Sequence, residues 1–487
     1  MRRVPAWVAP ASLYLVAVAA RLSLAWTRPF GDEAHHYYIA RHFGHGPTNV
    51  LGMLDNEWLF WWRPLFSLLL SPGAQFGFTG FRVGYVLLAA VLAPALWSWL
   101  RGRGVSPVAS ATAGGLAALH PFLVVWGVRA FPDGLMVAVF VAGLAVWERG
   151  RVLAGAALLL AATWVKEVAL VGVAVILVEE LLPDVHRDRW DLQVRLRPRH
   201  VALLAVLALS YVPHLYAESI GGRSPGWSRD GSLAAVVDGA FTTIWFVPLV
   251  AVGLLFRQSR RPAILALAYL AFFGGYAVAF GGRAEQWYFV MPTVLGIAAA
   301  VAAIDAARVS ARPALRRLAR PAAAVAVAIL AAQVLLPAAT AGKQEALHPT
   351  VDVFELSYLE TVRAERGRDQ DLWTALDQLR GDDLHNVFLV DVAWFFAIWP
   401  VSERADLVAT AYTVGSAPDG VWVAAIEEVA NTTFLRVEGT PLNLAIRDVY
   451  EDCITVASRE YVILRGQGCQ GRGAQLHAAF DARQVQA

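Results

Sequence analysis

Charged residues are scarce in this 487-residue chain, at 16% of the total, whereas hydrophobic residues make up 57% and tryptophans number 18. So little charge does not fit a soluble globular protein, and the composition is typical of a chain that crosses a membrane many times. The length also exceeds what one hydrophobic core usually serves. We therefore expect an α-helical polytopic membrane protein with more than one folding unit.

Cysteine is almost absent, because Cys453 and Cys469 are the only two. This excludes a disulfide-rich scaffold; one disulfide between them would suit an oxidising compartment, and two cysteines present by chance are the alternative. A small-residue cleavage site is also lacking after the first apolar run, residues 8–26. Arg2 and Arg3 are therefore expected to precede an uncleaved span rather than to begin a signal peptide.

A strong net charge is lacking too, since the formal total is only +2. Residues 1–342 carry 29 Lys and Arg against 17 Asp and Glu, whereas residues 343–487 carry 12 against 22. A basic membrane portion is followed by an acidic, water-soluble portion, which gives no support for nucleic-acid binding. We expect a transmembrane domain over 1–341, including a first outer loop at 27–78, and a soluble domain over 342–487.

Eleven apolar runs are candidate spans, although several are shorter than the roughly 20 residues that a helix needs to cross a bilayer. They cover residues 8–26, 79–100, 107–127, 133–147, 152–166, 168–182, 201–217, 236–256, 262–281, 287–304 and 322–340. With a cytoplasmic N-terminus, 19 arginines fall in every second connection, as the positive-inside rule requires. The tail from Thr340 onward and the other connections then lie outside the cytoplasm.

Two segments between and beyond the spans have their own character. Residues 56–72, NEWLFWWRPLFSLLLSP, are rich in Trp and Phe, which predicts an interfacial helix rather than a span. The tail alternates β-like runs with a helix-compatible stretch at 356–379, which predicts a small extracytoplasmic α/β domain with no recognisable catalytic motif. The β-like runs are residues 386–391, 420–426, 433–437 and 460–464.

Charged side chains at membrane depth are costly, so those that occur there are functional candidates. Nine such residues fall on the outer face in this topology. They are Asp32, Glu33, Arg63, Arg129, Asp133, Lys166, Glu167, Arg283 and Glu285. Each has an ordinary alternative as a helix cap, a surface ion pair or a loop charge. Their convergence on one face is less easily explained in that way.

Carboxylates beside Arg and Lys at the outer leaflet suit a specific type of chemistry. An anionic lipid headgroup would be the leaving group, and a neutral hydroxyl would be the nucleophile. The cations would hold the phosphate and stabilise its growing negative charge. One carboxylate would accept the proton of the attacking hydroxyl.

The order of the motifs carries a resemblance. GDEAHHYYIARHFG, then WWRPLF, RAFPDGLMVAVFVAGLAVW, WVKEVALVGV and EQWYFVMPTVLGIAAA resemble the GT-C superfamily of membrane glycosyltransferases. More narrowly, they are similar to the branch that contains protein O-mannosyltransferases and the aminoarabinose transferases of lipid A. The likeness covers roughly residues 10–305. Pro64-Leu65 replaces the branch's usual Pro-Pro, and no acceptor-peptide motif is evident.

The resemblance implies that a sugar is transferred, with inversion, from a polyprenyl- or dolichyl-phosphate donor to an acceptor hydroxyl. It puts the catalytic carboxylate at Asp32, with Glu33 as its neighbour, and a donor-phosphate contact at Arg63. Lys166 and Arg283 are further candidates for phosphate contacts. The supporting residues would be Arg129, Asp133, Glu167, Glu285, Tyr288 and His36, with Pro292 closing the last motif.

His35 and His36, next to Asp32 and Glu33, raise the alternative of a zinc or hard-cation site. Histidines in a polar loop are ordinary, and we expect neither a metal nor another cofactor. The expected partners are a polyprenyl-phosphate-linked sugar donor, membrane lipid, and an acceptor that is a glycan, a lipid or a protein. The expected location is the cell membrane, crossed many times, with an extracytoplasmic active site.

Two other functions stay open. A secondary transporter or lipid flippase would also use intramembrane charges, but it should place them near mid-bilayer and show paired repeats. The sequence shows neither feature. A scaffold or receptor whose tail is the working part is the second alternative.

Overall fold

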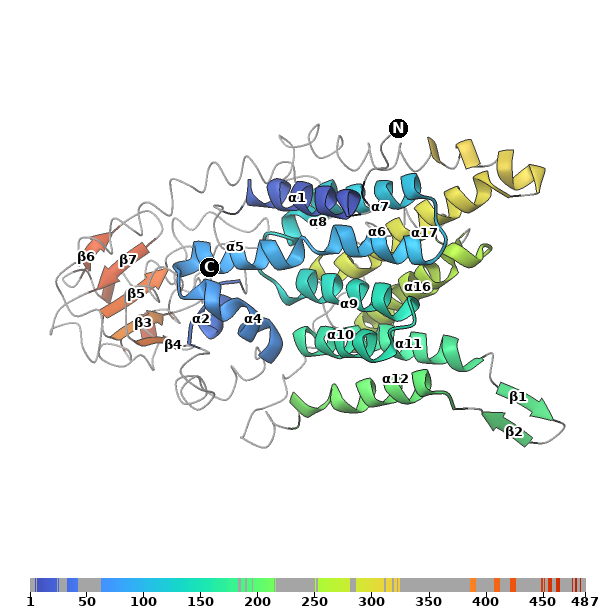
Figure 1. Cartoon of the computed structure of the whole chain (residues 1–487). Helices are drawn as coiled ribbons and strands as arrows, with labels where there is room; N and C mark the ends of the chain where they lie inside the picture. Colours follow the sequence, from blue (N-terminus) through green and yellow to red (C-terminus); the bar gives the residue numbers. More distant parts are fainter. Residues whose placement is uncertain are drawn as a thin grey trace. The chain divides into compact units, whose positions relative to one another are not determined.

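Figure 1 shows a computed structural model of the chain, which is mostly helical. The structure describes residues 5, 7–23, 25, 33–42, 63–182, 185–188, 191–194, 196–213, 215, 250, 253–280, 286–310, 312–317, 319–321, 323–324, 386–390, 407–411, 421–425, 448–449, 451, 454–457, 461–464, 475, 478–479 and 482. Two compact units divide the chain. Unit 1 contains residues 1–26, 56–73 and 79–357, and unit 2 contains residues 27–55, 74–78 and 358–487.

Unit 1 is a helical bundle with one small hairpin. Its helices are α1 (Val8–Leu22), α4 (Pro64–Ala74), α5 (Gly77–Ala89), α6 (Leu92–Gly102), α7 (Pro107–Leu119), α8 (Pro121–Trp126), α9 (Pro132–Glu148), α10 (Val152–Val165), α11 (Ala169–Leu181), α12 (Pro198–Leu209), α16 (Arg257–Phe280), the 3-10 helix η4 (Gln286–Phe289) and α17 (Val290–Arg308). Its hairpin pairs β1 (Val185–Asp188) with β2 (Asp191–Val194) in antiparallel fashion.

The apolar runs of the sequence correspond well to helices. Helices α9, α10 and α11 match three expected spans to within a residue at most boundaries. The run at 107–127 is instead divided into α7 and α8, because Pro121 has no N–H to continue the first helix. The runs at 236–256 and 322–340 lie largely outside the described residues, so the number of eleven spans stays a prediction.

Within the described part of the chain, two helical stretches are long and apolar enough to cross a membrane, Gly77–Gly102 and Val290–Arg308. The first joins α5 and α6. Five shorter apolar helices, α1, α4, α7, α10 and α12, fall below the length of a full span. By the length and composition of the described helices, two membrane crossings are supported, and the other expected crossings stay predictions.

Helix α9 lies at the centre of unit 1 and packs against α6, α10 and α17. Pro132 occupies the first helical turn, where its missing N–H costs nothing, and almost every later residue is buried. The approach of α10 depends on Gly155, because a Cβ there would lie 2.9 Å from backbone atoms of Trp147. A helix that is apolar on all sides fits this central position.

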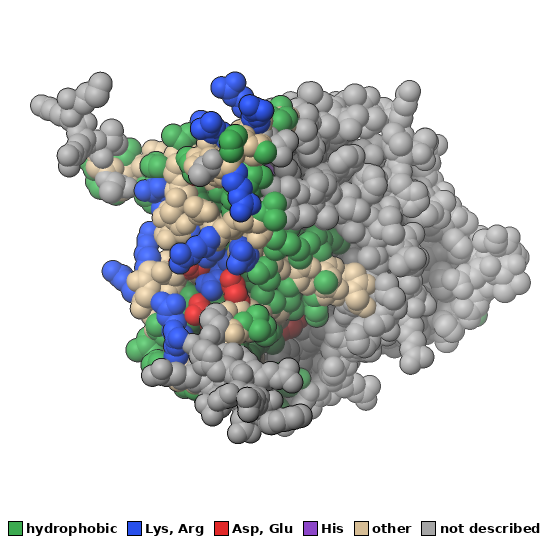
Figure 2. Space-filling model, turned by 90° about the vertical axis from the view of Figure 1, so that its right-hand side faces the viewer, with side chains coloured by type: hydrophobic (Ala, Val, Ile, Leu, Met, Phe, Trp, Pro, Cys, Tyr) green, Lys and Arg blue, Asp and Glu red, His purple; other side chains and the backbone are tan. Residues whose placement is uncertain are grey.

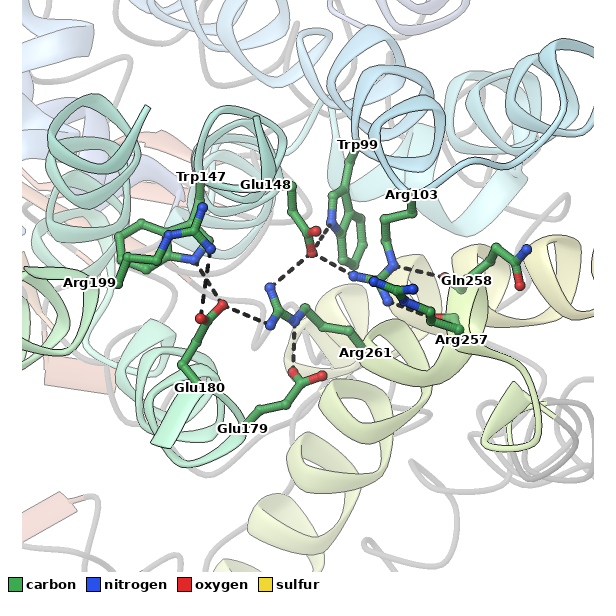
Figure 3. Close-up of polar contacts among 10 residues, drawn as sticks. All are labelled: Trp99, Arg103, Trp147, Glu148, Glu179, Glu180, Arg199, Arg257, Gln258 and Arg261. Carbon is green, nitrogen blue, oxygen red and sulfur yellow. Dashed lines mark hydrogen bonds and ion pairs between the residues drawn. The ribbon is translucent and has the colours of Figure 1, made fainter. Parts of the chain in front are cut away.

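One end of the bundle is held together by a network of ion pairs, which Figure 3 shows in close-up. Arg261, in the first turns of α16, contacts Glu148 at 2.9 Å, Glu179 at 2.7 Å and Glu180 at 3.0 Å. Arg103, just after α6, contacts the same Glu148 at 2.6 Å. Since Glu148 ends α9 and the other two glutamates end α11, one arginine ties three helices together.

Two further contacts extend this network. Arg199, in the first turn of α12, lies 3.7 Å from Glu180. Nearby, Asp305 of α17 accepts hydrogen bonds from the backbone N–H of Ser106 at 2.8 Å and from its hydroxyl at 2.6 Å, just before α7 begins. We call this end of unit 1 the arginine-rich end, because it carries most of the arginines that the sequence assigns to the cytoplasm.

Unit 2 contains helix α2 (Glu33–His42) and a five-stranded mixed sheet. Its strands, β3 (Asn386–Val390), β4 (Leu407–Ala411), β5 (Val421–Ala425), β6 (Ile454–Ala457) and β7 (Tyr461–Leu464), lie in the order β4-β3-β5-β7-β6. Strand β3 is parallel to β4 and β5, whereas β7 is antiparallel to β5 and β6. Short apolar, β-branched runs explain the strands.

Three of the β-like runs of the tail coincide with β3, β5 and β7. Strands β4 and β6 are further β-like runs that the sequence analysis did not name, and the β1–β2 hairpin lies in a connection that its arginines assigned to a loop. The run at 433–437, the helix-compatible stretch at 356–379 and both cysteines lie outside the described residues. The α/β class of the tail, its boundary at residue 341 and the disulfide therefore stay predictions.

Candidate active site

The start of α9 places an acid inside unit 1. Arg129, Ala130 and Phe131 form the turn after α8, and Pro132 begins the helix. Asp133 follows in the first turn and is 2% exposed. A carboxylate is favoured at a helix N-terminus, but one so deeply buried also needs a specific partner.

Lys166 is that partner. It ends α10 in an extended conformation, and its Nζ donates to both oxygens of Asp133, at 2.8 and 2.7 Å. The ammonium also lies over the ring of Tyr288, 4.6 Å from the centroid. A buried pair of this kind is well compensated only when the remaining donors find a partner, and the aromatic face supplies one.

Glu167, the next residue, links this pair to a second one. Its Oε1 accepts a hydrogen bond from Nη2 of Arg63 at 3.1 Å. The two side chains are 13% and 35% exposed, so this pair is more open to its surroundings than Asp133 and Lys166. Arg63 immediately precedes Pro64, the first residue of α4, so the start of this helix fixes its position.

Tyr288 provides the aromatic side of the group. It lies in η4, just before α17, and stacks on Phe273 of α16 with centroids 5.3 Å apart and rings 5° from parallel. Pro292 follows in the first turn of α17 and is buried. The stack fixes the ring that faces the Lys166 ammonium, because a parallel aromatic pair leaves little rotational freedom.

Arg129 lies near the same helix start and is 4% exposed. Its guanidinium lies over the ring of Trp126, 5.1 Å from the centroid. Trp126 is held in turn by Tyr85, whose hydroxyl donates to the Trp126 carbonyl at 2.9 Å. The turn that carries Arg129 is therefore fixed by buried aromatic residues.

A second buried arginine supports this turn, and sequence reasoning missed it. Arg21 of α1 is 1% exposed and donates to the carbonyls of Ala17 and Ala117, both at 3.1 Å. The Ala117 carbonyl has no helical donor, because the residue four positions on is Pro121. Arg21 thus supplies the hydrogen bond that the Ala117 carbonyl lacks at the break between α7 and α8. An arginine inside an apolar span was the available sequence signal.

The glycine next to Arg129's turn makes room for Arg21. A Cβ on Gly127 would lie 2.1 Å from the Arg21 Nε, so no larger residue fits there without moving the guanidinium. That Nε has no hydrogen-bond partner among the described residues. Arg21 is therefore held chiefly by carbonyl oxygens, which stabilise a cation through their dipoles.

Other residues of the predicted site belong to unit 2 or lie outside the described residues. In unit 2, Glu33 is in the first turn of α2, and both Glu33 and His36 are buried. Arg41 of the same helix donates to the Tyr37 hydroxyl at 2.8 Å. Asp32, Arg283 and Glu285 lie outside the described residues. The assignment of Asp32 as the base therefore stays a prediction.

The structure thus brings five of the predicted residues into one connected group, which we call the Lys166 group. Its members are Arg63, Asp133, Lys166, Glu167 and Tyr288. Formal charges within the group cancel. In the part of the chain that the structure describes, no three His, Cys, Asp or Glu side chains converge in a way that could hold a metal ion.

The fold of this chain is similar to that of a solved structure, which supports the predicted resemblance at the level of the fold alone. That structure is ArnT from Cupriavidus metallidurans bound to undecaprenyl phosphate, with a TM-score of 0.58. Identity is 18%, over 94% of this chain and 97% of that chain, so the likeness is one of fold. No protein-family model and no curated protein matches the chain.

Proposed function

We propose that the chain is an integral membrane glycosyltransferase that moves a sugar from a polyprenyl-phosphate donor to an acceptor hydroxyl. The observation that carries the proposal is the Lys166 group, with two cations and an aromatic face inside a GT-C fold. The solved neighbour holds undecaprenyl phosphate, which is the leaving group of such a donor. An anionic lipid headgroup and a polar, charged site at helix ends are chemically matched.

The reaction we propose is a single displacement at the anomeric carbon. The acceptor oxygen forms a bond to that carbon while the bond from the carbon to the phosphate oxygen breaks, which inverts the configuration. Asp32, with Glu33 beside it, takes the proton of the hydroxyl. The released phosphate monoester gains negative charge, and Arg63, Lys166 and Arg283 stabilise it.

Lys166 and Arg63 have distinct roles in this reaction. Asp133 engages two of the three Lys166 N–H donors and the ammonium lies over the Tyr288 ring, so Lys166 is held in place and attracts an anion as a point charge. Arg63 donates to Glu167 through Nη2, and in the proposal its guanidinium attracts the donor phosphate. Asp133, Glu167 and Tyr288 therefore act as positioning residues in the proposal, as do Arg129, Glu285 and His36.

The proposal also includes the location and the partners. The site faces away from the cytoplasm, the donor is bound in the membrane, and the acceptor is a glycan, a lipid or a protein. The positive charge of the three cations replaces a divalent metal, so we propose that none is required. The sugar is the least constrained element, because the described contacts are to charged groups rather than to hydroxyls.

A flippase or transporter is the competing function, and the arginine-rich end argues against it. Alternating access requires helices to separate at each end in turn. At this end Arg261 joins α9, α11 and α16 through contacts of 2.7–3.0 Å, and Arg103 adds α6. Separating the helices there would break the contacts between three largely buried carboxylates and two guanidinium groups.

Sugar transfer by membranes that contain the chain tests the proposal. Undecaprenyl-phosphate-linked aminoarabinose and mannose are the probes, and release of undecaprenyl phosphate is the measurement. Wild type should release it, and Asp32→Asn should reduce the rate by at least about a hundredfold, the usual contribution of a general base. Asp32→Asn should still bind undecaprenyl phosphate.

The alternative predicts the reverse pattern. A flippase would move a fluorescent undecaprenyl phosphate across liposomes at the same rate with Asp32→Asn. Failure of wild type to bind undecaprenyl phosphate at all would overturn the donor assignment. Normal transfer by Asp32→Asn would overturn the assignment of the base but not the enzyme class.

A further inference from the structure

A short segment after α17 has an unusual charge pattern. Residues 308–320, RVSARPALRRLAR, contain five arginines and no Asp or Glu. The structure describes helical turns at 313–317 and 319–321 within it. We call residues 308–320 the basic segment.

The arginines of the basic segment face outward. Arg308, Arg312, Arg316, Arg317 and Arg320 are all exposed. No side-chain hydrogen bond or ion pair joins any of the five to another described residue. In contrast, Arg103, Arg199 and Arg261 at the same end are engaged by glutamates. The basic segment is thus a group of cations that no described carboxylate contacts.

The nearby acids are already in use. Glu148, Glu179 and Glu180 contact the arginines of the ion-pair network, and Asp305 accepts from Ser106. Figure 2 faces this end and shows Lys and Arg side chains spread around a few acidic ones. The excess positive charge must therefore be balanced from outside the described structure.

The segment also has an apolar component. Val309 is 76% exposed and presents an aliphatic side chain to its surroundings, whereas Ala319 is buried. The arginine distribution puts this end on the cytoplasmic side, directly after a helix long enough to span the bilayer. A basic, partly apolar segment next to a membrane span lies at headgroup level.

We infer that the basic segment binds the anionic lipid headgroups of the cytoplasmic leaflet. Guanidinium groups donate to phosphate oxygens in pairs, and adjacent turns space Arg312, Arg316 and Arg317 for neighbouring headgroups. Val309 enters the acyl-chain boundary beside them. This site is at the opposite end from the proposed donor site in the predicted topology, and it does not depend on the proposed function.

Native mass spectrometry of the full chain in neutral detergent tests the inference. The probes are dioleoyl phosphatidylglycerol and dioleoyl phosphatidylcholine, added separately. Wild type should bind phosphatidylglycerol at least about tenfold more tightly than phosphatidylcholine, because each basic residue at a membrane surface contributes to the free energy of binding to anionic lipid. The variant R312Q/R316Q/R317Q/R320Q should lose that preference.

A matched control removes the same charge from the same end. Arg149, Arg151, Arg257 and Arg260 are also exposed, but they lie outside the basic segment. The variant R149Q/R151Q/R257Q/R260Q should keep the preference for phosphatidylglycerol. Melting temperatures without added lipid identify any variant that is misfolded, and for such a variant single substitutions at Arg316 and Arg317 replace the set.

Three results would overturn the inference. The first is an unchanged preference in the variant of the basic segment. The second is an equal loss in the control, which would mean that the whole end acts as a diffuse charge. The third is competition by inorganic phosphate at millimolar concentration, which would identify a soluble anion rather than a lipid as the ligand.

Discussion

Lys166 and Asp133 are 33 residues apart in the chain, yet the Lys166 ammonium lies 2.7 and 2.8 Å from the two Asp133 oxygens. Both side chains are buried, at 9% and 3% exposed. The pair joins the end of α10 to the beginning of α9 and faces Tyr288 of η4. Burial makes this relationship asymmetric, since losing one partner costs far more than losing both.

The first prediction follows from that asymmetry. Asp133→Asn leaves the ammonium buried without its counter-charge and should reduce the free energy of unfolding by about 3–5 kcal/mol. The double variant Asp133→Leu/Lys166→Met should be less destabilised than Asp133→Asn, although it should lose transfer activity. Melting temperature in detergent is the measurement. Equal melting of the single and double variants would show that the pair is not desolvated.

The second prediction separates the two ion pairs. Arg63→Gln should weaken undecaprenyl phosphate binding by about tenfold or more, because a charge-assisted hydrogen bond is lost. Glu167→Gln should weaken binding less than Arg63→Gln does, because it removes a positioning contact but keeps the charge of Arg63. Both changes should alter stability by less than about 1 kcal/mol, as for other partly exposed pairs. An equal loss of binding in the two variants would contradict a role for Glu167 that is limited to positioning Arg63.

The third prediction concerns Arg21 and the helix break. In Arg21→Met the Ala117 carbonyl loses its donor, which should cost about 1–3 kcal/mol if Pro121 is present. Pro121→Ala supplies a backbone N–H for that carbonyl, so Arg21→Met should be less harmful in that background. The four variants form a double-mutant cycle on melting temperature. If the effects of the two substitutions on melting temperature simply add, Arg21 does not compensate for the N–H that Pro121 lacks.

The fourth prediction concerns metals. Because Arg63, Lys166 and Arg283 supply the positive charge in the proposed reaction, chelation with EDTA should leave the transfer rate unchanged. The measurement is release of undecaprenyl phosphate before and after dialysis against chelator. A lost rate that zinc or magnesium restores would favour the alternative with His35 and His36 as ligands.

Sequence patterns predicted the helices of unit 1 well, because apolar runs bounded by Pro and charged residues mark helix ends directly. Pro132 before Asp133 and the Lys166-Glu167 interruption gave the start of α9 and the end of α10 to within a residue. The positive-inside count grouped the charged residues on one face. It did not show that Glu167 would meet Arg63 across 104 residues.

Other features were beyond the sequence for a physical reason. The glutamates at positions 148, 179 and 180 look like ordinary charges at helix ends, and their shared partner Arg261 is 81 to 113 residues away. Pairing over such distances depends on how helices pack rather than on spacing. The β1–β2 hairpin was missed because its two short strands carry charged residues that also suit a loop.

The ion-pair network has a mechanical consequence for the bundle. Helices α6, α9, α11 and α16 are tied together at the arginine-rich end, so they resist separation there. In the proposed function, a long isoprenoid chain that slips sideways between these helices would therefore enter nearer the opposite end, where Lys166 lies. Substrate and product would then pass through the same opening between helices, and the rate of turnover would depend on how often these helices separate.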